Sequence, residues 1–118
     1  MFQAATLTVD DFLPAGGQGI VALQIRADDH AARSSLAPLN DAATLLCLRA
    51  EREFLRLLEG DCGTPVGVLS RVRNELIEIS AQLFDEAGGE PRAATLRQTR
   101  AEQTPEHLAA ELLELING

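Results

Sequence analysis

Apolar residues recur at two different spacings in the second half of the chain, and the two spacings predict different elements. Between residues 40 and 60 they recur every three to four positions, which predicts an amphipathic helix. The buried stripe of this helix comprises Ala43, Leu46, Cys47, Ala50, Phe54, Leu57 and Leu58. Asn40 is placed to cap the helix, Leu39 to pack back onto it as a hydrophobic staple, and Gly60 to end it.

Beyond residue 64 the pattern changes to that of β-strands. Residues 65–72, 76–84 and 92–99 predict three consecutive strands, each bounded by turn-forming residues. The middle strand alternates, with an apolar face that comprises Ile77, Ile79, Ala81 and Leu83. The third strand is mostly polar, so we expect it at an edge of the sheet.

A last helix is predicted from Thr104, which we expect to cap it, with Pro105 in the first helical position. Its apolar face comprises Leu108, Leu112, Leu115 and Ile116. The order helix, three-stranded meander, helix predicts an α+β fold in which a three-stranded antiparallel sheet packs against helices. We assign residues 37–118 to this domain.

The first 36 residues have a different pattern and form an N-terminal arm. Residues 20–26 predict a strand that is nearly all apolar up to Ile25, as expected for a strand covered on both faces. The chain offers this strand few neighbours, so we describe residues 1–36 as a strand-bearing arm. An unpaired apolar strand tends to pair with another copy, so we expect a homodimer through the strand Ile20–Ile25. A short helix is expected over residues 28–37.

Charge and composition exclude several classes of function. The net charge is −8 and all ten basic residues are Arg. This charge argues against nucleic-acid binding, and it also argues against the binding of polycarboxylated ligands by this chain alone. No apolar run approaches the ~20 residues that span a bilayer, so we expect no membrane segment. The N-terminus lacks a basic region followed by an apolar one, which argues against a signal peptide. Two cysteines do not make a disulfide framework, and a reduced cytoplasmic setting is the simpler interpretation.

Cys62 is the candidate for chemistry, because it follows the predicted end of the main helix by a few residues. The negative end of the helix dipole and the neighbouring Glu59 and Asp61 all disfavour a thiolate. A hydrolytic nucleophile needs the opposite environment. The environment suits a thiol that is alkylated once by a strong electrophile and then keeps an inert thioether. Spacing alone leaves open a simpler interpretation, that of a small apolar residue in a loop.

Two stretches of the sequence resemble one family. Residues 51–67, EREFLRLLEGDCGTPVG, resemble the cofactor-attachment signature of hydroxymethylbilane synthase, also called porphobilinogen deaminase. Asp61 departs from the family pattern, where Gly or Ser is usual. Residues 13–19, LPAGGQG, resemble a second element of the family, and the following strand ending in Arg26 matches too. The resemblance covers nearly the whole chain but only the C-terminal part of the enzyme, with residues 1–36 resembling the closing segment of its first domain.

The resemblance implies a function for the complete enzyme. The family condenses four porphobilinogen units into hydroxymethylbilane, in tetrapyrrole and heme biosynthesis, on a dipyrromethane cofactor that the residue matching Cys62 holds through a thioether. Gln18 and Gly19 match a loop close to that cofactor and are candidates for supporting it. The catalytic Asp and the Arg cluster of the first two domains have no counterpart here. The resemblance therefore implies no catalytic residue in this chain, which is expected to be inactive alone and to meet porphobilinogen and the cofactor only through missing N-terminal domains.

Other candidates for chemistry are weaker. His30 and His107 lack the spacing of a zinc site, so no metal is expected. The glycine-rich stretch 16–19 precedes a predicted strand, not a helix, which argues against a phosphate loop. Cys47 is expected in the core. The charged residues of the main helix predict a solvated face with paired charges, made of Arg49, Glu51, Arg52, Glu53, Arg56 and Glu59. From a different class of function, the alternative hypothesis is a stand-alone interaction or structural module that has the fold without the chemistry.

Overall fold

The computed structural model describes residues 2–58, 65–85, 87–101 and 104–118. The elements in chain order are α1 (His30–Leu36), the 3-10 turn η1 (Ala37–Leu39), α2 (Ala42–Leu58), β1 (Val66–Arg73), β2 (Leu76–Leu83), β3 (Arg92–Thr99) and α3 (Thr104–Asn117). The predicted α+β fold is confirmed, with the expected order of helix, three-stranded meander and helix.

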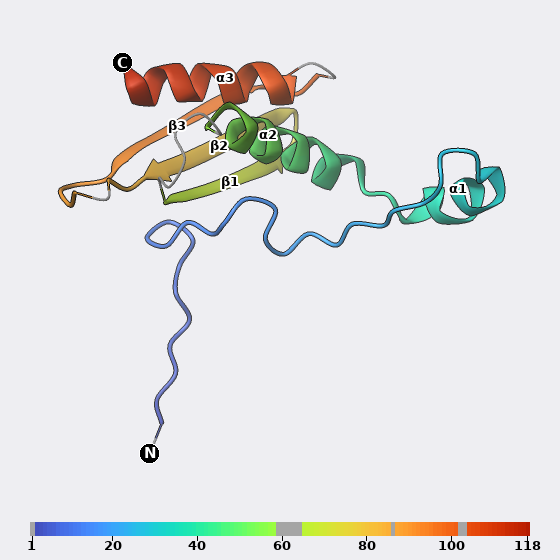
Figure 1. The fold of residues 1–118 in the computed structure, drawn as a ribbon, viewed down its shortest axis with the longest axis horizontal. Coiled ribbons are helices and arrows are strands. Elements are labelled where there is room, and N and C mark those ends of the chain that lie inside the picture. The colour runs from blue at the N-terminus through green and yellow to red at the C-terminus, as the bar shows by residue number, and fades with distance from the viewer. Residues whose placement is uncertain (1, 59–64, 86, 102–103) are drawn as a thin grey trace.

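The three strands form one antiparallel sheet in the order β1-β2-β3, and both long helices cover the same face of it (Figure 1). In the central strand Ile79 lies opposite Ser70 of β1 and Leu96 of β3. The alternation predicted for β2 is confirmed, because Ile77, Ile79, Ala81 and Leu83, the four residues of its predicted apolar face, are all buried. β3 lies at an edge, as its polar sequence predicts.

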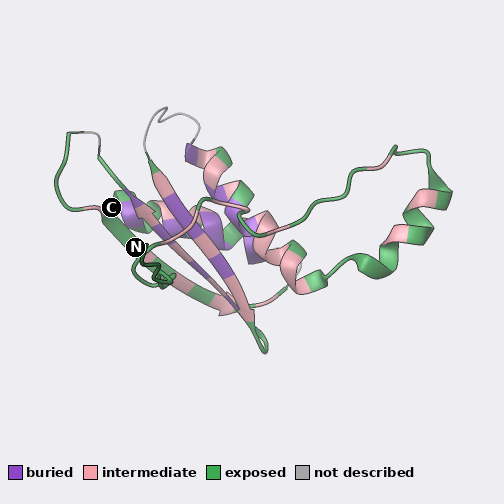
Figure 2. Ribbon diagram, turned by 90° about the horizontal axis from the view of Figure 1, so that it is seen from below, coloured by how far each residue is buried: buried purple, intermediate pink, exposed green. Residues whose placement is uncertain are grey.

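The core is aliphatic apart from one ring, and it lies between the sheet and the two long helices. Its largest fully buried side chains are Phe54, Ile77, Ile79, Leu108, Leu112, Val68 and Pro105. Buried residues are confined to the sheet, α2 and α3, as the purple segments of Figure 2 show, and the described part of the arm contributes none. The arm is therefore an addition to the domain that forms the core.

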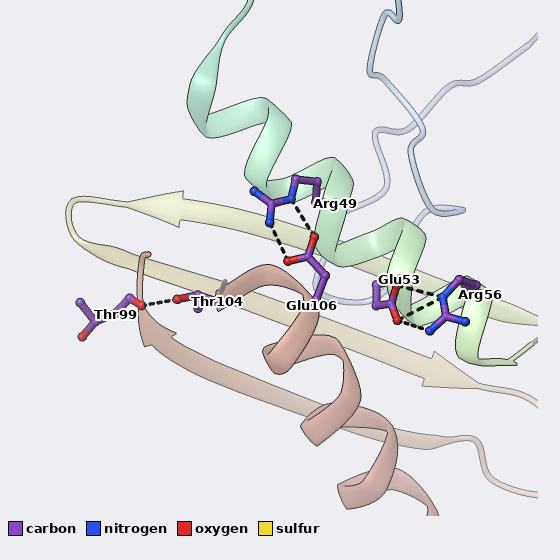
Figure 3. Close-up of polar contacts among 6 residues, drawn as sticks. All are labelled: Arg49, Glu53, Arg56, Thr99, Thr104 and Glu106. Carbon is purple, nitrogen blue, oxygen red and sulfur yellow. Dashed lines mark hydrogen bonds and ion pairs between the residues drawn. The ribbon is translucent and has the colours of Figure 1, made fainter. Parts of the chain in front are cut away.

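The helix ends differ from the prediction in three details. Asp41, not Asn40, caps α2, because its Oδ1 accepts a hydrogen bond from the Ala43 N–H at 3.0 Å. Leu39 is 68% exposed and forms no staple. The Thr104 hydroxyl donates to the Thr99 carbonyl oxygen at 3.0 Å (Figure 3), so it ties the start of α3 to the end of β3 and does not cap the helix.

The apolar faces of the two long helices are largely as predicted. In α2 the predicted residues Ala50, Phe54 and Leu58 are buried, and the others are half-buried. In α3 Leu115 is 54% exposed, and Ala109 is buried instead, because it lies one turn before Leu112 on the face toward α2. The predicted helix end at Gly60 lies outside the described residues.

The strand predicted at residues 20–26 is not formed. The segment runs out from the domain without pairing, and among the described residues no hydrogen bond engages the backbone of residues 21–25. A strand forms only by pairing with a partner strand. The sheet consists of β1, β2 and β3, and residues 20–26 pair with none of them. Val21 is consequently 87% exposed, and the two-sided burial inferred from its sequence is absent.

The arm gives the molecule an extended outline. Figure 1 shows the arm running past β1 and out to α1 at its far end, from where the chain returns to α2. Among the helices and strands, α1 contacts only the adjacent η1. The radius of gyration is 16.4 Å, against about 13.5 Å for a compact domain of this length. None of the helices in the described part of the chain combines the length and apolar character needed to cross a bilayer.

Candidate functional site

The predicted attachment residue, Cys62, lies outside the described residues, together with Glu59 and Asp61. The elements on either side of it in sequence are well defined. α2 is described to Leu58, which is buried in the core, and β1 begins at Val66. The candidate site is therefore built from the side chains that hold these two elements together.

Glu51 of α2 is the side chain that joins them. It is only 2% exposed, although its sequence predicted a place on a solvated helix face. One carboxylate oxygen accepts a hydrogen bond from the Gly17 N–H at 2.9 Å, and the other accepts from the Ser70 N–H at 3.1 Å. One buried carboxylate thus links α2, the arm and β1.

The environment of Glu51 shifts its proton affinity in a defined direction. Burial raises the pKa of the Glu51 carboxyl above its ordinary value, because desolvation disfavours the charged form. The backbone N–H groups of Gly17 and Ser70 oppose that shift, since both donate to the carboxylate. A charged acceptor makes stronger hydrogen bonds than a neutral one, so the arm is held by more than apolar contact.

The arm residues 13–18, which we call the arm loop, also close the outer edge of β1. The Val68 N–H donates to the Pro14 carbonyl oxygen at 2.9 Å. Val68 and Ser70 are alternate residues of an edge strand, and alternate N–H groups of such a strand point away from the sheet. The arm loop and Glu51 together satisfy two donors that would otherwise invite pairing with another chain.

Two glycines allow the arm loop to approach β1 and α2 this closely. A Cβ at Gly67 would lie 2.8 Å from both the Cβ and the carbonyl oxygen of Leu13. A Cβ at Gly16 would lie 2.6 Å from Leu55 Cδ1 and 3.0 Å from Val68 Cγ1. The two stretches that carry the family resemblance are therefore in contact, and each contributes a glycine to that contact.

Of the two residues predicted to support a cofactor, Gln18 is the last residue of the arm loop and Gly19 follows it. The Gln18 Oε1 accepts a hydrogen bond from the Ala15 N–H at 3.2 Å and the Gln18 N–H donates to the Ala15 carbonyl oxygen at 3.1 Å, so this residue closes its own turn. Gly19 has a φ of +83°, which L side chains rarely adopt. A role of either residue toward a cofactor stays a prediction.

Two of the three arginines of α2, Arg49 and Arg56, are paired with carboxylates. Arg49 makes two hydrogen bonds of 2.7 Å to the carboxylate of Glu106 on α3, which joins the two helices (Figure 3). Arg56 binds Glu53 within α2, which confirms one predicted i,i+3 pair. The guanidinium of Arg49 lowers the pKa of Glu106, mainly through these hydrogen bonds. The described residues contain no group of three histidine, cysteine or acidic side chains that could hold a metal ion.

Cys47 is half-buried on α2 and carries a free thiol. Burial, followed by the charges of Glu51 and Asp41, raises the pKa of this thiol from 9.0 to about 11. We expect alkylation of Cys47 by iodoacetamide at neutral pH to be about a hundredfold slower than that of an ordinary cysteine, because the thiolate is the reacting form. The rate should still be rising above pH 9, whereas a plateau near pH 9 would contradict the raised pKa. The urea-unfolded chain supplies the reference rate.

Sequence reasoning missed Glu51, although a signal for it was present. Glu51 lies four residues after Cys47 and three before Phe54, in the middle of the apolar stripe of α2. A single carboxylate on such a stripe needs a polar partner, which the backbone of the arm and of β1 provides.

Comparison with known proteins gives a consistent result. The family model described as "Porphobilinogen deaminase, C-terminal domain" matches residues 45–114. The porphobilinogen deaminase of Chloroherpeton thalassium is 45% identical over 71 residues, which make up 60% of this chain and 23% of the relative. That of Nitrobacter hamburgensis is 36% identical over 96 residues, or 81% of this chain and 30% of the relative. That of Syntrophobacter fumaroxidans is 51% identical over 57 residues, which make up 48% of this chain and 18% of the relative. The chain thus spans less than a third of the length of these curated relatives.

Proposed function

Since the chain belongs to the porphobilinogen deaminase family through that family's C-terminal domain, we propose that it is the cofactor-attachment part of a hydroxymethylbilane synthase, with Cys62 as the attachment residue. In this proposal Cys62 holds a dipyrromethane through a thioether bond. The complete enzyme would condense four porphobilinogen units into hydroxymethylbilane, as a step of tetrapyrrole biosynthesis in the cytoplasm.

The hydrogen-bonded link from Gly17 through Glu51 to Ser70 is the observation that carries this proposal. It brings the arm loop onto the two elements that flank Cys62 in sequence. Two separate stretches with the family pattern therefore form one structural unit. A chance match of two short stretches would not require such a contact between them.

The chemistry of Cys62 follows from its place after α2. A helix C-terminus disfavours a thiolate, so the thiol suits a single alkylation more than repeated nucleophilic turnover. When bound, the dipyrromethane would supply the pyrrole end onto which further units are added. The protein's own contribution here is to hold that group at a fixed point.

We also propose that this chain does not turn over porphobilinogen alone. Its net charge is −8, and three of its ten arginines, Arg49, Arg56 and Arg97, already pair with a carboxylate of the same chain. Acetate and propionate groups of the substrate bind best to clustered cations, and a chain of this net charge disfavours them. In this proposal a second polypeptide supplies the rest of the enzyme.

Complementation tests this proposal. The chain is mixed with the rest of the Nitrobacter hamburgensis relative, expressed as a separate polypeptide, and porphobilinogen consumption is followed. We expect consumption only with both polypeptides present. Cys62→Ser should abolish it and Cys47→Ser, the matched control, should leave it intact. A mixture in which the second polypeptide folds and binds but consumes no porphobilinogen would favour the stand-alone interaction module.

We further propose that residues 20–25 pair with the same segment of a second copy. Their backbone between residues 21 and 25 has no hydrogen-bond partner among the described residues, and the segment contains no charged side chain. Antiparallel self-pairing would satisfy these groups. Two chains of charge −8 repel one another, so the dimer should tighten as salt is added.

Light scattering over a dilution series tests the dimer. Leu23→Pro removes one N–H from the exposed segment and should raise the dissociation constant at least about tenfold. Leu7→Pro, at another exposed position of the arm that lies outside helices and strands, is the matched control and should have little effect. A monomer at all concentrations and salt levels would rule the dimer out.

A further inference from the structure

We propose that Glu51 is a positioning residue for cofactor attachment. It holds α2, β1 and the arm loop together, and we call this arrangement the frame. α2 and β1 are the elements before and after residues 59–65 in the sequence, which we call the Cys62 stretch. This inference rests on the proposed function. It assigns to Glu51 a role that acts through Gly17 of the arm loop and Ser70 of β1.

Glu51 has the geometry of a clamp and not that of a surface charge. Both of its oxygens are used, at 2.9 Å by the arm loop and at 3.1 Å by β1, and its own helix leads directly into the Cys62 stretch. The strand it holds, β1, begins directly after that stretch. A single side chain therefore fixes the element before the attachment residue relative to the element after it.

A second set of contacts holds the same parts without Glu51. Pro14 accepts from the Val68 N–H, and Leu13 packs against the backbone of Gly67 where no Cβ would fit. Gly67 is only two residues from the end of the Cys62 stretch at Pro65. The frame can thus be opened from two independent sites, by removing the carboxylate or by adding a methyl group at Gly67.

The clamp lies outside the main core, so it can be opened while the domain stays folded. The core is centred on residues that face the sheet from α2 and α3, such as Phe54, Ile79 and Leu112. Glu51 faces the arm loop and the outer edge of β1. Loss of the clamp should therefore free the arm loop without unfolding the sheet.

The first readout is amide hydrogen exchange, which reports docking of the arm loop. Glu51→Gln and Gly67→Ala should each lower the protection of both the Gly17 and the Val68 amides by about tenfold more than that of Ile79, whose amide reports only the change in global stability. Ser70→Ala keeps the backbone N–H that donates to Glu51, and Glu53→Gln removes a half-buried carboxylate of the same helix, two residues after Glu51, that pairs with Arg56. Both controls should behave like the wild type. Unchanged protection in both clamp variants would overturn the clamp.

The second readout is the fraction of Cys62 that carries a dipyrromethane-sized adduct after incubation with the complementing polypeptide and porphobilinogen. In both clamp variants it should fall by about fivefold, while alkylation of Cys62 by iodoacetamide should not fall, since a small reagent needs no defined frame. A wild-type chain that acquires no adduct would refute the proposed function. A wild-type chain and clamp variants loaded to the same extent would refute the positioning role of Glu51 and leave the proposed function standing.

Discussion

Phe54→Ala is expected to lower the free energy of unfolding by about 3–5 kcal/mol, the cost of removing a fully buried ring from a core that cannot refill the space. Phe54 is the one aromatic residue among the fully buried side chains of the described chain, and it lies on α2 where that helix packs on the sheet. A small domain has about 5–15 kcal/mol of stability in total. The variant should therefore lose a large share of its stability and unfold at a clearly lower urea concentration than the wild type.

Urea unfolding followed by circular dichroism measures this effect. Leu115→Ala is the control, because Leu115 is an apolar residue of α3 that points largely into solvent. It should change the free energy of unfolding by no more than about 0.5 kcal/mol. A loss below about 1.5 kcal/mol for Phe54→Ala would mean that the core is not centred where the structure places it.

Glu51→Ala is expected to lower the free energy of unfolding by about 2–3 kcal/mol, because it leaves the N–H groups of Gly17 and Ser70 without their acceptor. Undocking of the arm loop lets water reach these groups, which limits the loss. Glu53→Ala is the matched control on the same helix, since its i,i+3 pair with Arg56 contributes about 0.5 kcal/mol or less. Urea unfolding measures both variants. Equal losses of unfolding free energy for Glu51→Ala and Glu53→Ala would contradict the buried position of Glu51.

The pH dependence of this effect has a defined sign. The folded-state pKa of Glu51 is raised above its ordinary 4.5, so the folded chain binds this proton more tightly than the unfolded one. The resulting stability is fully present below pH 4.5 and is lost as pH rises through the folded-state pKa. The stability of the wild type relative to Glu51→Gln should therefore increase as pH falls from neutral toward 4.

Glu106 should show the opposite trend, because Arg49 lowers its pKa. Its contribution is present above pH 4.5 and is lost as pH falls through the lower folded-state pKa. Urea unfolding of Glu106→Gln and Glu51→Gln across the acidic range compares the two directly. Parallel trends for the two variants would contradict the assigned environments.

The sequence predicted those parts of the fold that depend on local periodicity. The strand residues Ile77 and Ile79 alternate with polar neighbours, and both are buried as expected. The helix of residues 42–58 and the turn at Asn74 were also foreseeable, since spacing and turn chemistry act within a few residues. The absence of the predicted strand at residues 20–26 was not foreseeable, because a strand depends on a partner that the composition of the segment does not reveal.

The candidate site was predictable only in part, for the same physical reason. Cys62 and the arm loop were recognised from their residues, but the contact of the arm loop with α2 and β1 depends on pairs 34 and 19 residues apart, Gly17 with Glu51 and Glu51 with Ser70. Arg49 likewise bridges to Glu106 across 57 residues, where sequence spacing suggested partners on its own helix. Long-range partners of charged side chains are set by packing, which a periodic pattern does not encode.

The measurement that tests the central claim most directly is the intact mass of the chain after incubation with the complementing polypeptide and porphobilinogen, with the modified residue located by peptide mapping. Our account predicts an adduct of dipyrromethane mass on Cys62 and an unmodified Cys47 in the same molecule. An unmodified Cys62 in the presence of an active complementing polypeptide, or an adduct on Cys47 instead, would contradict it.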